Sequence, residues 1–263
     1  MPELKAIIFD VDGTLADTEE VHRQAFNEAF TEFGLDWNWT PSLYAELLST
    51  SGGRERMRLF GADLKSSFRS EQDFERFIRD IHRTKSVIYR DKLVSGHVAL
   101  RPGVARLIDE ARAAGLTLAI ATSSSTANLH ALLDANLAAD WHSWFATVHT
   151  GDTVPVKKPA PAVYRAVLDD LKMPASATVA IEDTVNGMLA ATAIEIPVVI
   201  TTHYFTRHHH FPKALLVTDG LGSADAPAQA LSGDLGAAGL VTVEMLKALV
   251  EGSEPSIALA AQA

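Results

Sequence analysis

The chain has 263 residues, 47% of them hydrophobic and 21% charged, which is typical of globular proteins and excludes wholesale disorder and fibrous repeats. Its 23 basic and 33 acidic residues give a net charge of −10 with no basic block, so we expect neither a nucleic acid nor a membrane surface as partner. The absence of cysteine excludes disulfides, thiolate catalysis and cysteine-based zinc sites. Because no apolar run is long enough for a signal peptide or a membrane span, we expect a cytoplasmic protein, and we expect it to be a monomer.

Short apolar runs predict five buried strands, because each is rich in Ile, Val, Leu or Ala. They lie at residues 6–9, 116–121, 178–181, 198–200 and 215–217. Between them, residues 103–114 and 161–171 carry apolar stripes at helical spacing. This alternation predicts an α/β fold, a Rossmann-like doubly wound parallel sheet with helices on both faces. Ligands bind such sheets at the carboxyl ends of the strands.

The connection between the first two strands spans roughly 110 positions, whereas a crossover needs only a dozen or more residues. It carries helical patterns and no convincing strand. One pattern covers residues 17–34, with Asp17 and Thr18 as candidate N-terminal caps, and another covers residues 74–81. We therefore expect residues 17–97 to form a helical cap domain.

The remaining segments, residues 1–16 and 98–263, are expected to form the α/β core domain. Residues 241–250 predict a closing helix, and we expect the last dozen residues to be frayed.

The first strand ends in two aspartates, Asp10 and Asp12, followed by Gly13 and Thr14. In a loop past the strand end both carboxylates can point into one pocket, and Gly13 permits the tight turn. Taken alone, an Asp-x-Asp pair is more often a solvated acidic turn. Three further polar segments, each at a strand end or just before a helix, weaken that interpretation: Thr122-Ser123-Ser124-Ser125, Lys157-Lys158-Pro159 and Glu182-Asp183-Thr184.

Together these segments supply a carboxylate nucleophile, a hydroxyl, an ammonium and a second acidic cluster, which phosphoryl transfer through an aspartyl phosphate requires. Mg²⁺ prefers oxygen ligands and commonly takes one or two protein carboxylates. Asp10 and Asp183 are the candidate carboxylate ligands, and the backbone carbonyl of Asp12 is a third. The metal and Lys158 would offset the repulsion between nucleophile and phosphate, which leaves the Asp12 side chain to act as general acid and base.

Phe-Asp-Val-Asp-Gly-Thr-Leu, a strand-ending Ala-Thr, Lys-Lys-Pro and Ile-Glu-Asp-Thr resemble the four ordered motifs of the haloacid dehalogenase (HAD) phosphatase superfamily. The helical insert resembles that superfamily's C1 cap. The resemblance implies Asp10 as nucleophile, Asp12 as acid/base, and a metal bound by Asp10, Asp12 and Asp183. It also implies phosphate binding by Thr122, Ser123 and Lys158, with Glu182 as a further candidate for positioning the metal.

Up to about residue 220 the chain is also similar to the CbbY proteins. The similar segments are DTEEVHR (17–23), DWNW (36–39), TSGGRER (50–56), IHRTK (81–85) and YFTRH (204–208). The resemblance implies a phosphatase of xylulose-1,5-bisphosphate, a product that inhibits Rubisco. The Ala-rich tail and the three serines 123–125, where threonines are expected, depart from the family pattern and leave the sugar open.

Four cap residues are candidates for binding the substrate: Glu19, His22, Arg54 and Lys85. Arg54 follows a Gly-Gly pair that allows close approach, and arginine suits bidentate phosphate recognition. The alternative for Lys85 is an ordinary solvated lysine, and for His22 a surface or core histidine. Two cap tryptophans, at positions 37 and 39, predict cap core rather than a sugar platform.

Three alternatives to a phosphosugar phosphatase remain. A β-phosphoglucomutase-type mutase would share His22, Arg54 and Lys85, and would pass the phosphoryl group to the sugar instead of water. A haloacid dehalogenase needs no metal and has no use for Asp12. A signalling receiver domain also pairs an acceptor aspartate with Thr, Lys and Mg²⁺, but the long insert argues against it.

Overall fold

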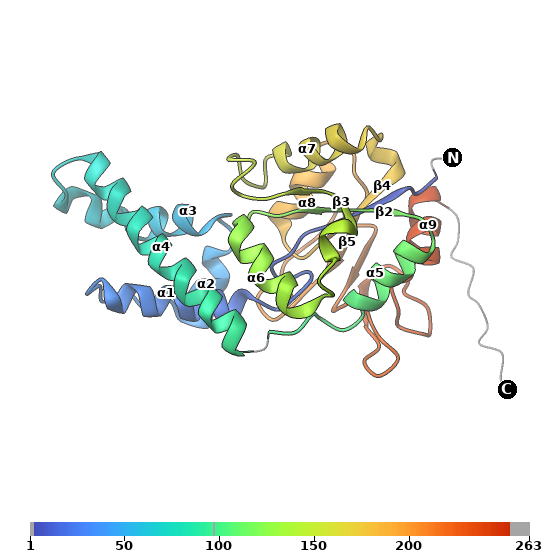
Figure 1. Cartoon of the computed structure of the whole chain (residues 1–263), viewed down its shortest axis with the longest axis horizontal. Coiled ribbons are helices and arrows are strands. Elements are labelled where there is room, and N and C mark those ends of the chain that lie inside the picture. The colour runs from blue at the N-terminus through green and yellow to red at the C-terminus, as the bar shows by residue number, and fades with distance from the viewer. Residues whose placement is uncertain (1–2, 97, 253–263) are drawn as a thin grey trace.

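The computed structural model describes residues 3–96 and 98–252 and contains a seven-stranded sheet in the order β3-β2-β1-β4-β5-β6-β7 (Figure 1). All neighbouring strands are parallel except β6 and β7. The strands are β1 Ala6–Phe9, β2 Thr117–Ala121, β3 Phe145–His149, β4 Thr178–Glu182, β5 Val198–Thr201, β6 Leu216–Thr218 and β7 Ala230–Ser232. This confirms the predicted α/β class with a mostly parallel sheet.

Helices pack on both faces of the sheet because successive strand residues point to opposite sides. Ile7 and Phe9 join one apolar cluster with helices α5, α6 and α9, whereas Ile8 joins another with α7 and α8. The helices are α5 Val104–Ala113, α6 Thr126–Asn136, α7 Ala162–Leu171, α8 Val185–Thr192 and α9 Val243–Glu251. The sheet is therefore covered on both faces.

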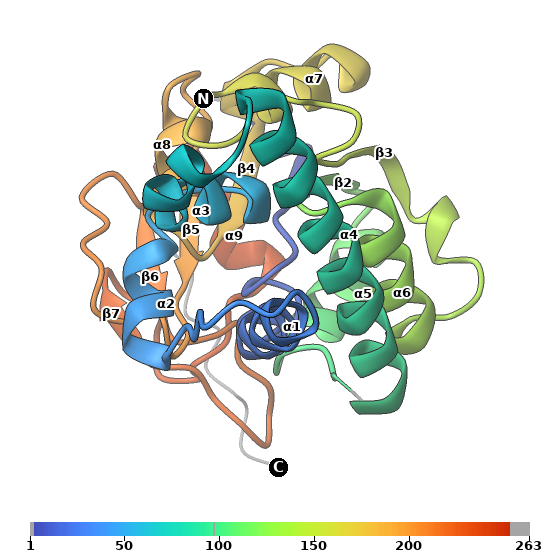
Figure 2. The same ribbon diagram turned by 90° about the vertical axis from the view of Figure 1, so that its left-hand side faces the viewer.

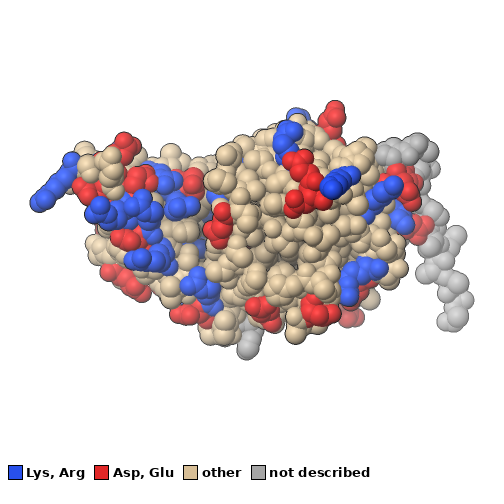
Figure 3. Space-filling view, turned by 45° about the horizontal axis from the view of Figure 1, so that its top comes forward, with Lys and Arg blue, Asp and Glu red and all other residues tan. Residues whose placement is uncertain are grey.

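Four helices lie between β1 and α5 and project from one end of the sheet (Figures 1 and 2). These cap helices are α1 Glu19–Glu32, α2 Pro41–Leu47, α3 Gly53–Phe60 and α4 Glu71–Gly96, with a 3₁₀ turn at Ala62–Ser67. Their apolar faces enclose most of an aromatic cluster, in which Trp39 is fully buried and Trp37 partly buried, as predicted. The face in Figure 3 shows most basic side chains over the cap, interspersed with acidic ones.

Two short backbone links hold the start and end of the cap segment together. Ala16 bridges Leu100 in antiparallel fashion, and the Arg101 amide donates to the Leu15 carbonyl at 2.8 Å. The two chain segments that connect the cap to the core therefore lie side by side, next to the loop that follows β1.

The structure corrects several element predictions. Thr18 precedes α1, but its hydroxyl donates to Asp12 instead of capping the helix. The edge strands β3 and β7 were not predicted, because β3 has a single fully buried residue and β7 is wholly exposed, so neither forms an apolar run. None of the described helices is long and apolar enough to cross a membrane. The predicted fraying at 253–263 falls outside the described residues.

Candidate active site

The carboxyl ends of β1, β2 and β4 bring the predicted motifs together. Phe9 pairs with Ile120 on one side and Ile181 on the other, so the residues that follow these three strands meet at one edge of the sheet. The Asp10 amide continues the ladder by donating to the Ile181 carbonyl at 3.0 Å. The local cause is the short length of β1, whose four apolar residues end at the polar loop.

Lys158 lies at the centre of the buried site. Its Nζ donates to Asp10 Oδ1 at 2.6 Å, to Glu182 Oε1 at 2.5 Å and to the Ala121 carbonyl at 2.9 Å. Burial alone would lower the pKa of Lys158, but the two carboxylates outweigh it and raise that pKa. Lys158 is therefore held as a cation beside Asp10. Tyr164 also donates to Glu182 Oε1, at 2.7 Å, which fixes the second carboxylate.

Three buried carboxylates, those of Asp10, Glu182 and Asp183, each offer an oxygen within 4.8 Å of the others. Burial raises the pKa of Asp10 well above its usual range and that of Asp183 to about 6, because charged carboxylates are poorly solvated there and repel one another. A divalent cation would relieve this repulsion, so the donor set fits a hard metal ion that takes oxygen ligands. Since Glu182 already accepts from Lys158 and Tyr164, Asp10 and Asp183 are the better-placed ligands.

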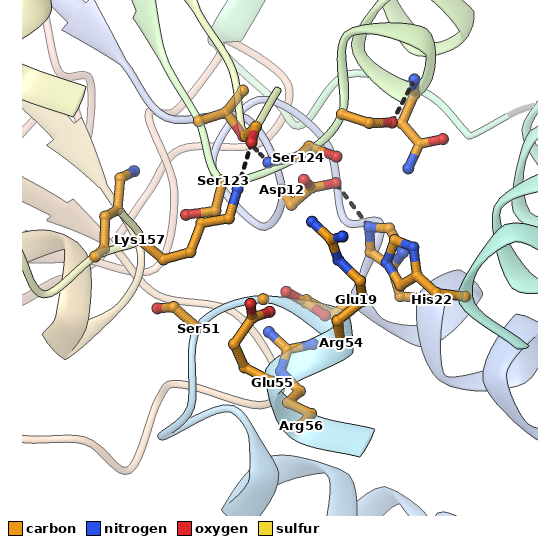
Figure 4. A pocket seen from close by; sticks show the side chains of 18 of the residues that line it. Asp12, Glu19, His22, Ser51, Arg54, Glu55, Arg56, Ser123, Ser124 and Lys157 are labelled. Atoms are coloured by element: carbon orange, nitrogen blue, oxygen red, sulfur yellow. Dashed lines mark hydrogen bonds and ion pairs between the residues drawn. The ribbon is translucent and has the colours of Figure 1, made fainter. Parts of the chain in front are cut away.

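The Asp12 side chain contacts His22 of the cap (Figure 4) and is not one of the three clustered carboxylates. Its Oδ1 accepts from the Thr18 hydroxyl at 2.7 Å and lies 3.0 Å from His22 Nε2. Burial would raise the pKa of Asp12, but His22, Thr18 and the nearby Lys85 together lower it. Any contribution of Asp12 to a metal would thus come from its backbone carbonyl, which leaves the carboxylate free for proton transfer.

Lys85 is buried beneath His22, with only 3% of its surface exposed, so the alternative of a solvated lysine is wrong. Its Nζ contacts His22 Nδ1 and lies 4.7 Å from the ring centre of Phe26 and 4.6 Å from that of Tyr89. The His22 ring stacks on Tyr89 at 3.9 Å. Burial lowers the pKa of Lys85 to about 7, and burial together with Lys85 lowers that of His22.

The start of α3 forms another wall of the pocket, which Arg54 and Arg56 line (Figure 4). Arg56 Nη1 donates to the Tyr44 hydroxyl at 3.0 Å, and that hydroxyl donates to Glu19 Oε2 at 2.6 Å. Glu19 is therefore held by the cap itself at the pocket wall. Gly52, at φ +94°, gives α3 its sharp start.

The loop after β2 supplies hydroxyl and amide groups. The buried Thr122 hydroxyl accepts from the Ser124 amide at 3.0 Å, and Ser123 lines the pocket beside it. Lys157 also lines the pocket and donates to the Gly151 carbonyl at 2.7 Å.

All the predicted core and cap site residues except Glu182 line this one pocket, and Glu182 lies directly behind Lys158. Four further residues at the site were not predicted from the sequence: Arg56, Lys157, Tyr164 and His203. Lys157 and Arg56 stand in quoted motifs next to residues that were chosen. Tyr164 reads as an ordinary apolar position of a helix. His203 Nε2, 2.9 Å from Asp183 Oδ2, immediately precedes a quoted segment.

A parallel α/β sheet with paired aspartates at its carboxyl edge, a buried lysine and a helical cap defines a class of hydrolase with an acidic, cation-lined active site. Residues 4–194 match the family profile described as "haloacid dehalogenase-like hydrolase", and the chain belongs to that family. It is therefore an enzyme, and the site has the composition of a phosphoric monoester hydrolase.

Individual relatives agree with this assignment. The chain is 47% identical to a plasmid-encoded CbbY protein of Cupriavidus necator over 85% of this chain and 88% of the relative. A crystal structure of a CbbY variant from Rhodobacter sphaeroides in complex with xylulose-1,5-bisphosphate has a TM-score of 0.75 and 39% identity, and covers 84% of this chain and 96% of that one. A β-phosphoglucomutase structure from Clostridium difficile has a TM-score of 0.66 at 22% identity over 82% of this chain and 91% of that one, a likeness of fold alone.

Proposed function

We propose that this chain hydrolyses a sugar bisphosphate, xylulose-1,5-bisphosphate, through an aspartyl phosphate on Asp10. One observation carries the proposal: a chain with a net charge of −10 gathers five cations around a single pocket. They are Arg54, Arg56, Lys85, Lys157 and Lys158. The same pocket also holds six carboxylates, but its basic side chains come from both the core and the cap, an arrangement that suits a substrate with a phosphate at each end.

The substrate is supported by the relatives. The Rhodobacter CbbY variant was crystallised with xylulose-1,5-bisphosphate, and the chain matches nearly all of that protein's length. A second CbbY structure from the same organism holds phosphate, with a TM-score of 0.73.

The proposed reaction has two steps. First, an Asp10 carboxylate oxygen attacks phosphorus, the bond from phosphorus to the sugar oxygen breaks, and Asp12 gives a proton to that oxygen. Second, water attacks the phosphorus of the aspartyl phosphate, Asp12 takes its proton, and Asp10 and inorganic phosphate are released. Lys158, Thr122 and Ser123 hold the phosphoryl oxygens.

The geometry around Asp12 suits this exchange of a proton. Its carboxylate is ionised in the free enzyme, which is the form that accepts the proton of water. Asp12 takes up a proton from solvent as the substrate binds, and His22 Nε2, 3.0 Å from Asp12 Oδ1, helps to hold the carboxylate in place. The Thr18 hydroxyl fixes the orientation of Asp12 during both steps.

Asp10 and Asp183, with the Asp12 backbone carbonyl, would hold Mg²⁺, and Glu182 would support them through Lys158. When bound, the ion supplies positive charge that draws the phosphate in and stabilises the charge developing during transfer.

The cap would select the substrate by meeting its second phosphate. Arg54 is the best-placed donor, since its neighbour Arg56 is engaged by Tyr44 and by the Thr50 carbonyl, to which Arg56 Nε donates at 2.9 Å. A contact made across the cleft would favour closure and exclude water other than the attacking one.

The test is a phosphate-release screen with Mg²⁺ over sugar mono- and bisphosphates. We expect xylulose-1,5-bisphosphate to be turned over with the highest kcat/KM. β-Glucose 1-phosphate is included because conversion to glucose 6-phosphate without phosphate release would identify a mutase and contradict the proposal. The monomeric state and cytoplasmic location stay predictions, and light scattering after size exclusion tests the first.

A further inference from the structure

The turn that follows β5 contains a CbbY-like segment, residues 204–208, that has no part in the reaction described above. Its backbone is compact, because the His203 amide donates to the Thr206 hydroxyl at 3.1 Å and the Thr206 amide donates to the His203 carbonyl at 3.0 Å. The preceding residue is tied to the sheet, since the Thr202 amide donates to the Thr218 carbonyl at 2.7 Å. The turn is therefore a compact unit that is attached to the sheet at its first end.

One side of the turn contacts the acidic cluster. His203 Nε2 lies 2.9 Å from Asp183 Oδ2, and both side chains are buried. The pair packs against Gly13 so closely that a Cβ there would lie 2.3 Å from Asp183 Oδ2 and 2.8 Å from His203 Nε2. The other ring nitrogen of His203 is 3.8 Å from Asp17 Oδ1, at the start of the cap segment.

The other side of the turn enters the cap. Phe205 is 4% exposed and belongs to the aromatic cluster of the cap, whose other buried members in the described chain all lie between residues 26 and 81. Its ring meets Tyr44 edge-on, with centroids 5.5 Å apart. Tyr44 in turn holds Glu19 and Arg56 at the pocket wall.

We propose that residues 203–206 couple the packing of the cap on Phe205, here called the seated cap, to the metal site. His203 is the positioning residue of Asp183, and Phe205 is the anchor in the cap. The inference rests on the magnesium site of the proposed function. A cap seated on Phe205 holds the turn in the position at which His203 orients Asp183. Because coupling between sites is reciprocal, a metal bound at Asp183 then favours the seated cap.

The experiment measures Mg²⁺ affinity by calorimetric titration of the substrate-free protein, so its readout does not depend on turnover. His203→Ala should weaken Mg²⁺ binding about 10–100-fold, as loss of a partner of a metal ligand commonly does. Phe205→Leu removes no group near the metal, yet coupling predicts that it weakens binding about 3–30-fold.

Phe74→Leu is the matched control, because Phe74 is buried in the same cluster but belongs to α4 and packs against Phe68. It should loosen the cap core and leave Mg²⁺ affinity within about twofold. Circular dichroism checks folding, and Phe205→Met replaces Phe205→Leu if that variant does not fold.

An unchanged Mg²⁺ affinity in folded Phe205→Leu, or an equal loss in Phe74→Leu, overturns the coupling. Wild-type protein that binds no Mg²⁺ overturns the metal site and the coupling with it. Wild-type protein that binds Mg²⁺ but hydrolyses no sugar bisphosphate overturns the proposed substrate, while the comparison of Phe205→Leu with its control still decides the coupling.

Discussion

Lys85 carries a prediction about stability that depends on its burial. In the folded protein the ammonium group lies among His22, Phe26 and Tyr89 instead of water. Burial lowers its pKa from 10.5 to about 7, a change that the Asp12 and Glu19 carboxylates only partly oppose. The folded protein thus releases this proton above pH 7, whereas the unfolded chain keeps it to about pH 10.5.

The sign and size of the effect follow from proton linkage. Between pH 7 and 10.5 the unfolded state binds more protons at Lys85 than the folded state does, so the free energy of unfolding rises with pH. Each tenfold change in the protonation equilibrium is worth about 1.4 kcal/mol, so the full effect is about 5 kcal/mol. From pH 7 to pH 9 the gain from this group is about 2 kcal/mol.

The assay is urea unfolding of wild type and Lys85→Met at pH 7 and pH 9, without metal or substrate. The methionine variant cannot titrate, so wild type should gain about 2 kcal/mol relative to it over this interval. Lys92→Met, on the same helix with its ammonium paired to Glu28 at 2.6 Å, reports what loss of a helix lysine does by itself. A wild-type advantage that is the same at both pH values, or that shrinks at pH 9, would refute the placement of a buried ammonium at Lys85.

Three further predictions concern the reaction. Asp12→Ala should slow both formation and hydrolysis of the aspartyl phosphate by about 10²–10⁴-fold in single-turnover kinetics, and a rate within about threefold of wild type would assign acid–base catalysis to another group. Arg54→Ala should lower kcat/KM for the bisphosphate by about 10–150-fold, with little change for p-nitrophenyl phosphate. The control Arg58→Ala should affect neither substrate, because the Arg58 guanidinium is bound to Glu75 at 2.7 Å. Equal losses on both substrates with Arg54→Ala would show a structural role. Chelation with EDTA should abolish phosphate release, with Mg²⁺ restoring it and the larger Ca²⁺ doing so poorly; full activity after chelation would favour the dehalogenase chemistry.

The parallel core was predictable because its strands are buried on both faces. The strand at residues 6–9 was predicted from its apolar composition alone, and β1 has the same bounds. Burial on both faces makes such strands continuous apolar segments, whereas the edge strands β3 and β7 face solvent and leave no such signal. The order of the strands is a matter of long-range pairing that no local pattern contains.

The site could be predicted where its residues belong to motifs that directly follow a strand. Asp10 and Asp183 each follow a strand of a parallel sheet, so both could be placed at its carboxyl edge from the sequence, whereas the direct pairing of their strands β1 and β4 could not. The contacts that hold these site residues in place could not be predicted. The contact of Lys85 with His22 joins residues 63 positions apart, and that of His203 with Asp183 depends on how the turn after β5 folds back. Burial decides whether Lys85 is solvated, and burial is a property of the assembled cap.

The central claim, that Asp10 is phosphorylated during turnover, is tested most directly by rapid acid quench. The substrate is a sugar bisphosphate that carries radiolabel in the transferred phosphate, and the quenched protein is digested and mapped. We expect label on the peptide that contains Asp10 in wild type. Asp10→Asn should show neither label nor turnover while staying folded, because the change relieves repulsion among buried carboxylates. Label on another residue, or phosphate release by pure Asp10→Asn protein, would contradict the account.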